Sequence, residues 1–456
     1  MQTELHPAVA PSELDGRSAL DGNAPRSVRM LYPDLHGVAR GKDIPVAEFD
    51  HVIERGLCFC AAVMGTDLRH TPVWGGEEGY PDLVARPDLA TMATLPWDRE
   101  VAVCLADLSS AEGAAPIADP RGAVRVAVES LRALGLDPIV GPELEFFLVR
   151  RDPDAPNGIA RIVDNLSMVY TVGHQADPDG LARRMSEHLA ELGIGAFAVN
   201  HEFMNSQYEI NLRHCGALAA ADRAFLLKAS VKDIAAMHGL LATFMGKPFN
   251  DQGGSGTHLH VSLNRDGSNA LDADTDPARP DGLAPEAHHF IAGVLAHAPA
   301  LMALLNPTIN AYRRILPDSL APTHANWGYD NRSTLIRIPP ERGAATRIEL
   351  RVGDGAANPY LAIAATLAAG ADGIRRELAP PPPVTGDAYH ADPEIAGDAL
   401  PGTLETALDA LEQDAVLTDA LGGPIVDTFL TVKRFEVQRH REWVSDWDIA
   451  EYIHHL

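Results

Sequence analysis

The sequence has little cysteine, no long apolar run and few basic residues. Only four of its 456 residues are cysteine, and they are too scattered for a disulfide framework or a zinc ribbon. No stretch of about 20 residues is continuously apolar. Residues 1–25 lack the basic and apolar segments of a secretory leader. We therefore expect a cytoplasmic protein that does not cross a membrane, with a disordered tail over 1–25.

Positive charge is scarce relative to negative charge. The chain has 37 Lys and Arg residues against 63 Asp and Glu residues, which gives a net charge of -26. Such a surface repels nucleic acid and anionic membranes. We therefore expect no nucleic-acid partner, and any anionic ligand must bind in a local basic pocket.

The pattern of apolar residues predicts two domains. Residues 26–114 contain short apolar runs broken by Gly and Pro, which is typical of small strands followed by one helix. In residues 115–456, strands and helices alternate. Pro120 and Gly135 bound one predicted helix, and Asn358 and Gly370 suit the start and the stop of another.

Four segments alternate polar with apolar residues and predict strands with one chemically active face. In a strand, residues i and i+2 point to the same side, so "GGSGTHLHVSL" places His258, His260 and Ser262 together. Glu202 lies seven residues before Glu209 in the same region. The other three segments carry Glu143 and Glu145 in "PELEFFLV", Glu209 and Asn211 in "QYEINL", and Arg347, Glu349 and Arg351 in "RIELRV".

Each segment alone is typical of a solvated sheet face, but the four together indicate a metal site. Their polar positions use Glu, His and Arg, whereas an ordinary wet face also uses Thr, Ser and Lys freely. Carboxylates gathered on one surface repel one another unless divalent cations neutralise them. Ligands rich in oxygen, with one or two histidines, suit Mg²⁺ or Mn²⁺ better than structural zinc.

Arginines near these segments indicate a phosphate-bearing substrate. "YRRILPDSLAP" contributes Arg313 and Arg314, and "DNRSTLIRIP" contributes Arg332 and Arg337. A guanidinium group pairs in bidentate fashion with carboxylate or phosphate. Metal ligands beside arginines therefore point to a nucleotide as the simplest such substrate.

The order of these motifs resembles that of glutamine synthetase and its relatives, the ATP-dependent glutamate–amine ligases. The matching motifs include "GPELEFF", "GSGTHLHVSL", "NPTINAYRR", "NRSTLIRIP" and "GAANPYLAIAATLAAGADGI", and they extend along nearly the whole chain. The resemblance implies an α+β fold: a small β-grasp N-terminal domain, then a catalytic domain with a curved, mainly antiparallel sheet flanked by helices. It also implies ATP with Mg²⁺ or Mn²⁺ as cofactors, and a homododecamer of two stacked hexameric rings.

The resemblance also implies roles for individual residues. Glu145, Glu202 and Glu209 resemble the ligands of one metal, and Glu143, His258 and Glu349 those of a second. The implied nucleotide and phosphate contacts are His260, Ser262, Arg332, Arg337 and Arg347. The implied glutamate-binding residues are Gly254, Arg314 and Arg351. The implied catalytic residues are Asp67, Arg332 and Arg337.

Three departures from the family pattern affect the amine. The family's flap sequence "PGYEAP" is "PDSLAP" here, so Leu320 replaces a glutamate that helps to handle ammonium. The asparagine usual before the "GSG" turn is Gly253. The N-terminal "FDGSS", which supplies an amine-binding aspartate, is absent, and Asp67 in "MGTD" is its best substitute.

These departures favour a larger amine over ammonia. The loss of a charged flap disfavours a small cation and leaves room for an amine whose carbon chain contributes binding energy. We therefore predict a ligase that joins the γ-carboxylate of glutamate to ethanolamine, a diamine or a polyamine through γ-glutamyl phosphate. Glutamine synthesis from ammonia is the alternative. A non-catalytic structural or regulatory ring is the third reading, which the retained site residues disfavour.

Overall fold

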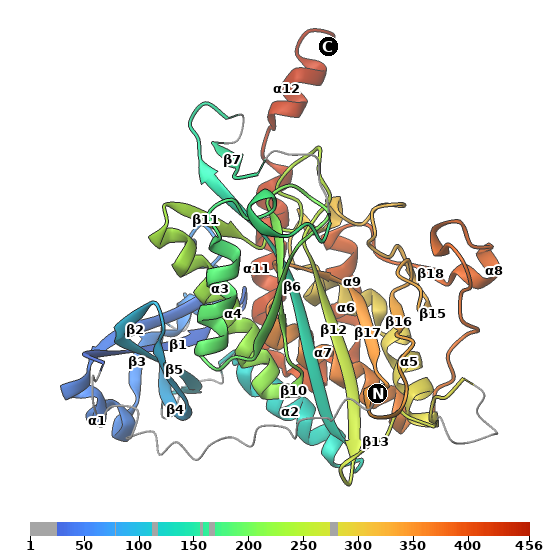
Figure 1. The fold of residues 1–456 in the computed structure, drawn as a ribbon, viewed down its shortest axis with the longest axis horizontal. Coiled ribbons are helices and arrows are strands. Elements are labelled where there is room, and N and C mark those ends of the chain that lie inside the picture. Colours follow the sequence, from blue (N-terminus) through green and yellow to red (C-terminus); the bar gives the residue numbers. More distant parts are fainter. Residues whose placement is uncertain (1–24, 78, 112–116, 156–157, 164–168, 274–280) are drawn as a thin grey trace.

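The computed structural model describes residues 25–77, 79–111, 117–155, 158–163, 169–273 and 281–456. The predicted tail therefore lies outside the described residues except for Pro25, which is buried. The predicted boundary at residue 114 also lies outside them. Within the described residues, two sheets form the scaffold, a small one from the N-terminal part and a large one at the centre (Figure 1).

The N-terminal sheet has five strands and one helix, as the punctuated apolar runs predicted. Its strand order is β2-β1-β5-β4-β3, in which β1 and β5 are parallel and the other neighbours are antiparallel. The name β-grasp stays a prediction. The elements are β1 Ser27–Pro33, β2 Ala39–Pro45, α1 Val46–Arg55, β3 Leu57–Cys60, β4 Asp82–Leu95 and β5 Asp98–Ser110.

The central sheet follows the order β15-β16-β17-β12-β6-β9-β8, with four short strands added at its margins. Neighbours along this path are antiparallel except β15 with β16, which confirms the mainly antiparallel prediction. The path strands are β6 Asp137–Arg151, β8 Ala196–His201, β9 Gln207–Leu212, β12 Gly256–Arg265, β15 Trp327–Tyr329, β16 Ile336–Ile338 and β17 Ile348–Asp354. The short strands are β7 Ile159–Arg161, β10 Cys215–Gly216, β11 Leu240–Thr243 and β13 Ser268–Asn269. A separate pair is β14 His324–Ala325 with β18 Asp398–Ala399.

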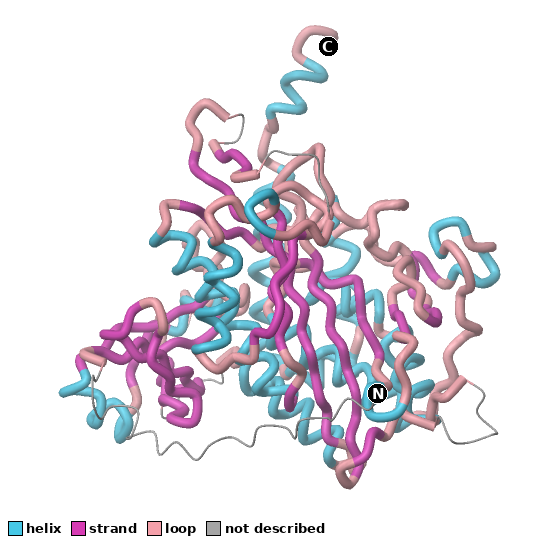
Figure 2. The backbone as a smooth tube through the Cα atoms, in the orientation of Figure 1, coloured by secondary structure: helices cyan, strands magenta, loops and turns pink. Residues whose placement is uncertain are grey.

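Helices cover one face of the central sheet and leave loops over its upper edge (Figure 2). The described helices after α1 are α2 Pro120–Arg132, α3 Leu181–Glu191, α4 Ala217–Met237, α5 Pro285–Ala296, α6 Ala298–Leu305, α7 Pro359–Arg375, α8 Pro393–Ala396, α9 Leu404–Gln413, α10 Ala415–Leu421, α11 Gly423–Arg441 and α12 Asp446–Tyr452. The helix predicted from Pro120 is confirmed as α2. The four cysteines are free, also as predicted.

The predicted stop at Gly370 is wrong, because α7 continues to Arg375. A Cβ atom at Gly370 would lie 2.1 Å from the ring of Phe290 in α5. Gly293 of α5 and Gly373 of α7 also meet the other helix's backbone closely. These glycines therefore let α5 and α7 approach each other at short distance. The predicted helix start at Asn358 is confirmed, because its side chain accepts a hydrogen bond from the amide of Tyr360.

Arg121 joins the N-terminal sheet to helix α4. Its guanidinium is 1% exposed and donates to Asp222 of α4 at 2.8 and 2.9 Å and to Asp88 of β4 at 2.7 Å. It also contacts Asp107 of β5. A buried guanidinium needs such partners, because a charge without them is costly inside a protein.

No single helix among the described residues is long and apolar enough to cross a membrane. Two bent combinations, α5 with α6 and α10 with residues 423–452, meet that test of length and composition only when joined across bends of 73° and 110°.

His297 links three helices through two carboxylates. Its Nδ1 lies 2.6 Å from Asp414 and its Nε2 3.1 Å from Asp372. Burial lowers the pKa of His297, but the hydrogen bonds that its ring donates to Asp414 and Asp372 outweigh burial and raise the pKa above its ordinary value. The imidazolium therefore neutralises two otherwise repelling carboxylates at the centre of the helical layer.

We expect His297 to stabilise the fold more at low pH than at high pH. Because the pKa is raised in the folded state, the stabilisation is complete below about pH 6.5 and is lost as the pH rises through the folded pKa. The difference in Tm between wild type and His297→Asn should be largest near about pH 6 and smaller near about pH 9. The exposed His174→Asn is the control. A difference that grows with pH would contradict this assignment.

Candidate active site

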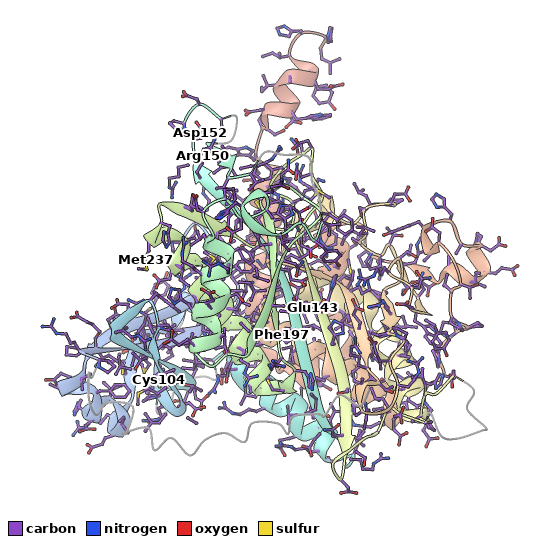
Figure 3. All side chains as sticks on the ribbon, in the orientation of Figure 1. Cys104, Glu143, Arg150, Asp152, Phe197 and Met237 are labelled. Atoms are coloured by element: carbon purple, nitrogen blue, oxygen red, sulfur yellow. The ribbon has the colours of Figure 1, made fainter. Side chains whose placement is uncertain are left out.

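The register of the central strands brings the predicted metal ligands together on one sheet face. Glu143 on β6 lies opposite His258 on β12, and Glu145 lies opposite Glu209 on β9. His260 lies opposite Glu349 on β17. Figure 3 shows Glu143 near the middle of the central sheet. Strands distant in sequence thus present the polar faces that their period of two predicted.

Glu145, Glu202 and Glu209 form one carboxylate group. One oxygen from each lies within 4.8 Å of the others, and Glu202 and Glu209 are buried. Glu145 accepts from the amide of Gly256 at 2.7 Å and from Gln207 at 2.9 Å. These donors fix the direction of the Glu145 carboxylate but carry no positive charge.

The pKa values of these carboxyl groups are raised. Burial, together with the nearby Glu202, raises the pKa of Glu145 to about 7. Burial and the charges of Glu143, Glu145 and Glu202 raise the pKa of Glu209 to about 9. Burial also raises the pKa of Glu202. The three groups cannot all ionise near neutral pH without a cation between them.

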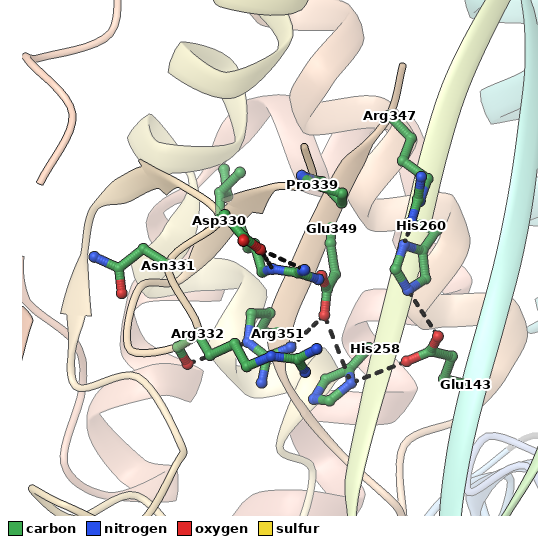
Figure 4. Close-up of polar contacts among 12 residues, drawn as sticks. Glu143, His258, His260, Asp330, Asn331, Arg332, Pro339, Arg347, Glu349 and Arg351 are labelled. Carbon is green, nitrogen blue, oxygen red and sulfur yellow. Dashed lines mark hydrogen bonds and ion pairs between the residues drawn. The ribbon is translucent and has the colours of Figure 1, made fainter. Parts of the chain in front are cut away.

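Glu143, Glu349, His258 and His260 form a second group, shown in Figure 4. The Glu143 carboxylate lies 3.3 Å from Nδ1 of His258 and 3.0 Å from Nε2 of His260. Glu349 lies 3.8 Å from Nδ1 of His258. The donor atoms of Glu143, His260 and Glu349 lie within 4.8 Å of one another. Both imidazoles thus lie beside Glu143, and the assignment of His258 rather than His260 as the ligand stays a prediction.

Arginines balance the charge of this second group. Arg337 donates to Glu349 at 2.6 Å, and Arg351 also contacts Glu349. Burial raises the pKa of Glu349, but Arg351 and the imidazoles outweigh it and lower the pKa to about 2. At Glu143, burial again raises the pKa, but the two histidines outweigh burial and lower the pKa. This half of the site is therefore ionised without an added cation, unlike the first group.

The predicted phosphate-binding residues border the second group. Arg332 is exposed, and no hydrogen bond or ion pair of its guanidinium occurs within the described residues. Arg347 donates to Nδ1 of His260 at 3.3 Å and to Glu341 at 3.2 Å. Ser262 follows His260 on the same face of β12. Their proximity fits an anionic ligand, and their individual roles stay predictions.

The predicted glutamate residues lie beside the turn before β12. A Cβ atom at Gly254 would lie 2.2 Å from the carbonyl of Gly246 and 2.7 Å from Arg314, so only glycine fits there. Arg314 is buried and donates to the carbonyls of Val352 and Gly353 at 2.7 Å, and its Nε makes no hydrogen bond but lies 3.6 Å from the carboxylate of Asp354. A buried donor of this kind suits a polar ligand.

Met204 accounts for the departure at Gly253. A Cβ atom at Gly253 would lie 2.8 Å from Cε of Met204, and the Gly253 amide donates to the Met204 sulfur at 2.9 Å. A side chain at position 253 would therefore require the end of the Met204 side chain to shift. Met204 places an apolar, flexible side chain beside the turn.

Asp67 lies apart from both groups. It is buried beside Arg439 of α11, and its carboxylate accepts from the amides of Arg69 and Thr71 at 2.8 Å. None of these partners belongs to the carboxylate, histidine or arginine groups described above. Its catalytic role stays a prediction.

Several supporting residues were missed by the sequence reasoning. Gln207 holds Glu145, Asn200 donates to Glu202 at 2.6 Å, and Asp330 holds Arg337 at 2.6 Å. Gln207 and Asn200 occupy positions two residues from a site glutamate, so strand periodicity could have found them. Asp330 lies in a turn and gives no periodic signal.

A family model described as the glutamine synthetase catalytic domain matches residues 117–452. The chain belongs to the glutamine synthetase family. It is 37% identical to a glutamine synthetase of Thermus thermophilus, over 95% of this chain and 97% of that one. It is 36% identical to a glutamine synthetase of Pyrococcus horikoshii, over 95% and 96% of the two chains.

Solved structures give the same result for the fold. A structure described as a GmaS/ADP complex is 31% identical, with a TM-score of 0.82 over 96% of this chain and 98% of that chain. A structure described as a novel glutamine synthase homolog is 29% identical, with a TM-score of 0.78 over 94% and 97%. The glutamine synthetase family consists of ATP-dependent carbon–nitrogen ligases that use Mg²⁺ or Mn²⁺.

The donor atoms of this site fit those ions. Glu145, Glu202 and Glu209 offer oxygen alone, and the second group adds imidazole nitrogen, which are the ligands that Mg²⁺ and Mn²⁺ accept. The repulsion that raises the pKa values of the first group is what a divalent cation would remove. The observed donor set therefore supports the metal prediction independently of the motif resemblance.

We expect divalent metal to reverse a loss of stability at high pH. A carboxyl group whose folded pKa is raised stabilises the fold below its ordinary pKa, and that stabilisation is lost as the pH rises through the folded value. In EDTA, Tm should therefore fall between about pH 5 and about pH 9, and Mg²⁺ or Mn²⁺ should restore it at the high end.

Glu209→Gln supplies the test of the carboxylate group. It removes one repelling charge and one ligand, so it should raise Tm in EDTA at high pH and reduce the gain from metal. Glu187→Gln, on the exposed side of α3, should change neither quantity. An unchanged metal response in Glu209→Gln would show that the ion binds elsewhere.

Proposed function

We propose that this protein joins the γ-carboxylate of glutamate to an amine larger than ammonia, with ATP supplying γ-glutamyl phosphate as the activated intermediate. Ethanolamine, diamines and polyamines are the candidate acceptors. The observation that carries the proposal is Leu320, which stands where the family's flap glutamate is expected. Its side chain is 50% exposed in the loop after Arg314, and its φ is +62°.

An apolar flap side chain changes which acceptor binds best. Ammonium is recognised by charge alone, whereas an organic amine also gains from contact between its carbon chain and apolar atoms. Met204 provides apolar atoms beside the turn that contains Gly254, and Leu320 adds an exposed apolar side chain six residues after Arg314. The flap loop's own carboxylate, Asp318, lies with Asp387 and His390 in an exposed group.

The structural neighbours support this acceptor class. GmaS is a gamma-glutamylmethylamide synthetase, so it is a relative that uses an organic amine. Glutamine synthesis from ammonia remains the second candidate, because the curated relatives at 36% and 37% identity are glutamine synthetases. A non-catalytic ring is the third candidate, and the retained carboxylate, histidine and arginine groups argue against it.

The site residues suit an acyl phosphate route. A carboxylate does not react with an amine in water, so its oxygen must first become a leaving group. Arg332 has a guanidinium free to meet the transferring phosphoryl group, and Arg337 is held toward it by Asp330 and Glu349. Bound divalent ions would withdraw charge from that group. Arg314 and Arg351 would orient glutamate. Asp67 of a neighbouring subunit would take the amine's proton only after its pair with Arg439 opens, because its side chain is fully buried in that pair.

Phosphate release with different acceptors tests the proposal. The assay supplies glutamate, ATP and Mg²⁺ with ammonium, methylamine, ethanolamine, putrescine or spermidine in turn. We expect an organic amine to give the highest kcat/KM. The highest kcat/KM with ammonium would instead establish the second candidate, and no turnover with any acceptor would favour the third.

Leu320→Glu should shift the preference toward ammonium. A carboxylate in the flap favours a small cation, so the ratio of kcat/KM for ammonium to that for the best amine should rise by about tenfold, which corresponds to about 1.4 kcal/mol. Leu316→Glu is the matched control, because Leu316 is also exposed in this loop. An equal ratio in both variants would show that the flap does not select the amine.

We propose further that the protein assembles as a dodecamer of two stacked hexameric rings, in the cytoplasm. The support comes from α12, which projects away from the rest of the chain at the C-terminus (Figure 1). Exposed apolar side chains lie in α12 and on both sides of it: Trp447 in the helix is 63% exposed, Trp443 at 64% and Val444 at 67% precede it, and Ile453 at 61% follows it. Exposed apolar area of this kind marks a protein contact.

Charged residues in α12 should weaken the assembly. Trp447→Glu with Ile453→Glu should lower the mass found by light scattering, because the carboxylates would be buried in the contact. Val172→Glu, at an equally exposed apolar residue far along the chain, is the control. A wild-type mass of one subunit would contradict the ring assembly.

A further inference from the structure

A cavity of about 380 Å³ lies between the N-terminal sheet and α4. This volume is in the range of small-ligand sites, about 300–1,000 Å³. Strands β1, β2, β4 and β5 form one wall, and one side of α4 forms the other, where Figure 1 shows the two parts next to each other. None of the candidate active-site residues is among the described residues that line it.

The walls of this cavity are apolar, with an indole on one side. Leu31, Leu95 and Val103 come from the N-terminal sheet, and Leu226 comes from α4. Trp97 lines the same space, and its Nε1 donates to Asp233 at 2.8 Å. The cavity therefore has room and surface for the hydrocarbon part of a ligand.

Three cations and one carboxylate also line the cavity. Arg29 is bound by Asp43 outside the cavity at 2.8 and 3.1 Å, and it lies 3.6 Å from Asp233. Asp233 therefore balances the charge of Arg29 and accepts the hydrogen bond of Trp97. Lys228 and Lys232 remain, and neither has a carboxylate within ion-pair distance among the described residues.

Lys228 is the more unusual of the two lysines. It is 5% exposed, and its Nζ donates to the carbonyls of Gly355 at 2.9 Å and Ala357 at 2.7 Å. An ammonium group has three donors, so one is left for the cavity. Burial and the nearby Lys232 lower the pKa of Lys228 to about 7. An anion in the cavity would restore the charge that burial disfavours.

Lys232 lies one turn of α4 after Lys228. Residues four apart lie on the same helix face, so both ammonium groups face the same space. Lys232 has no hydrogen bond or ion pair within the described part of the chain. Both Nζ atoms lie over the ring of Phe244, at 5.4 Å for Lys228 and 5.8 Å for Lys232 from its centroid. In a protein of net charge -26, two lysines without a carboxylate partner beside an apolar cavity form a local basic site.

We propose that this cavity binds a small organic carboxylate, with its carboxylate group between Lys228 and Lys232 and its hydrocarbon part against Trp97 and the apolar wall. The occupant is distinct from the glutamate of the reaction, since the cavity shares no lining residue with the site described above. It goes beyond the proposed function and does not depend on which amine is used.

The site has a direct structural link to the active site through Lys228. Gly355 and Ala357, which Lys228 holds, follow β17 with its Glu349 and Arg351. The amide of Gly355 donates to the carbonyl of Ser255 at 3.0 Å, next to Gly254. A carboxylate bound to Lys228 therefore alters the hydrogen bonds that Lys228 donates to Gly355 and Ala357. Because Gly355 is hydrogen-bonded to Ser255, this change reaches the turn beside the predicted glutamate residues. We expect binding to change KM for glutamate.

Calorimetric titration of the full-length enzyme tests the proposal, with hexanoate and benzoate as the probes. We expect saturable binding of at least one probe with glutamate and ATP analogue present in excess, so that the active site is blocked. 1-Hexanol, which has the same chain without the charge, should bind at least about tenfold more weakly. Inorganic phosphate, which lacks the apolar part, should also bind more weakly.

Two variants locate the binding site. Lys232→Glu reverses one charge, and Ala236→Trp fills the space one turn further along α4 while leaving both lysines intact. Each should weaken binding of the probe by about tenfold or more. Lys42→Glu makes the same charge change on β2 outside the cavity and should leave binding unchanged. Lys228 itself is kept, because its side chain holds the backbone.

The outcomes separate cleanly. Probe binding that is lost in Lys232→Glu and Ala236→Trp but kept in Lys42→Glu supports the proposal. No binding to wild type, equal binding in all variants, or tighter binding of phosphate than of either carboxylate overturns it. A wild-type KM for glutamate that does not respond to a bound probe refutes the link through Lys228. Because titration needs no turnover, these results stand whichever amine proves to be the acceptor.

Discussion

Repulsion among Glu145, Glu202 and Glu209 is the constraint on which this site depends. Cross-strand pairing aligns Glu145 with Glu209, and Glu202 follows the end of β8, so that one oxygen of each lies within 4.8 Å of the others. No cationic side chain of the described residues makes an ion pair with them. Neutral donors from Gln207, Asn200 and Asn211 only fix their orientation. The sheet therefore stores an unfavourable arrangement of like charges that a divalent ion relieves, and this links metal binding to the stability of the fold.

The second group shows the opposite solution to the same problem. Glu143 and Glu349 lie among two imidazoles and the guanidinium groups of Arg337 and Arg351, so they are ionised without help. A site with one charge-compensated half and one uncompensated half can bind ions unequally. The first group has the stronger need for a cation, and the second has charge already suited to contact with a phosphate-bearing ligand.

Much of this arrangement could be predicted from the sequence, because strand geometry is local. A period of two placed Glu143 with Glu145, Glu209 with Asn211, and His258 with His260 on common faces, and the register then aligned those faces. The same logic does not extend to tertiary packing. Gly370 has the local signature of a helix stop, yet it serves the close crossing of α5 and α7, which only the partner helix reveals. The sequence also did not predict a ligand site at Lys228 and Lys232, because the cavity forms between two surfaces that are far apart in the sequence.

Arg121 has a consequence for how the protein comes apart. One buried guanidinium holds Asp88 and Asp107 of the N-terminal sheet and Asp222 of α4 at the same time. Moving the N-terminal sheet away from α4 would break the ion pairs and hydrogen bonds that this one guanidinium makes to both parts. The two halves are therefore expected to melt in one cooperative event, and neither is a module that can be exchanged between relatives without carrying this contact along.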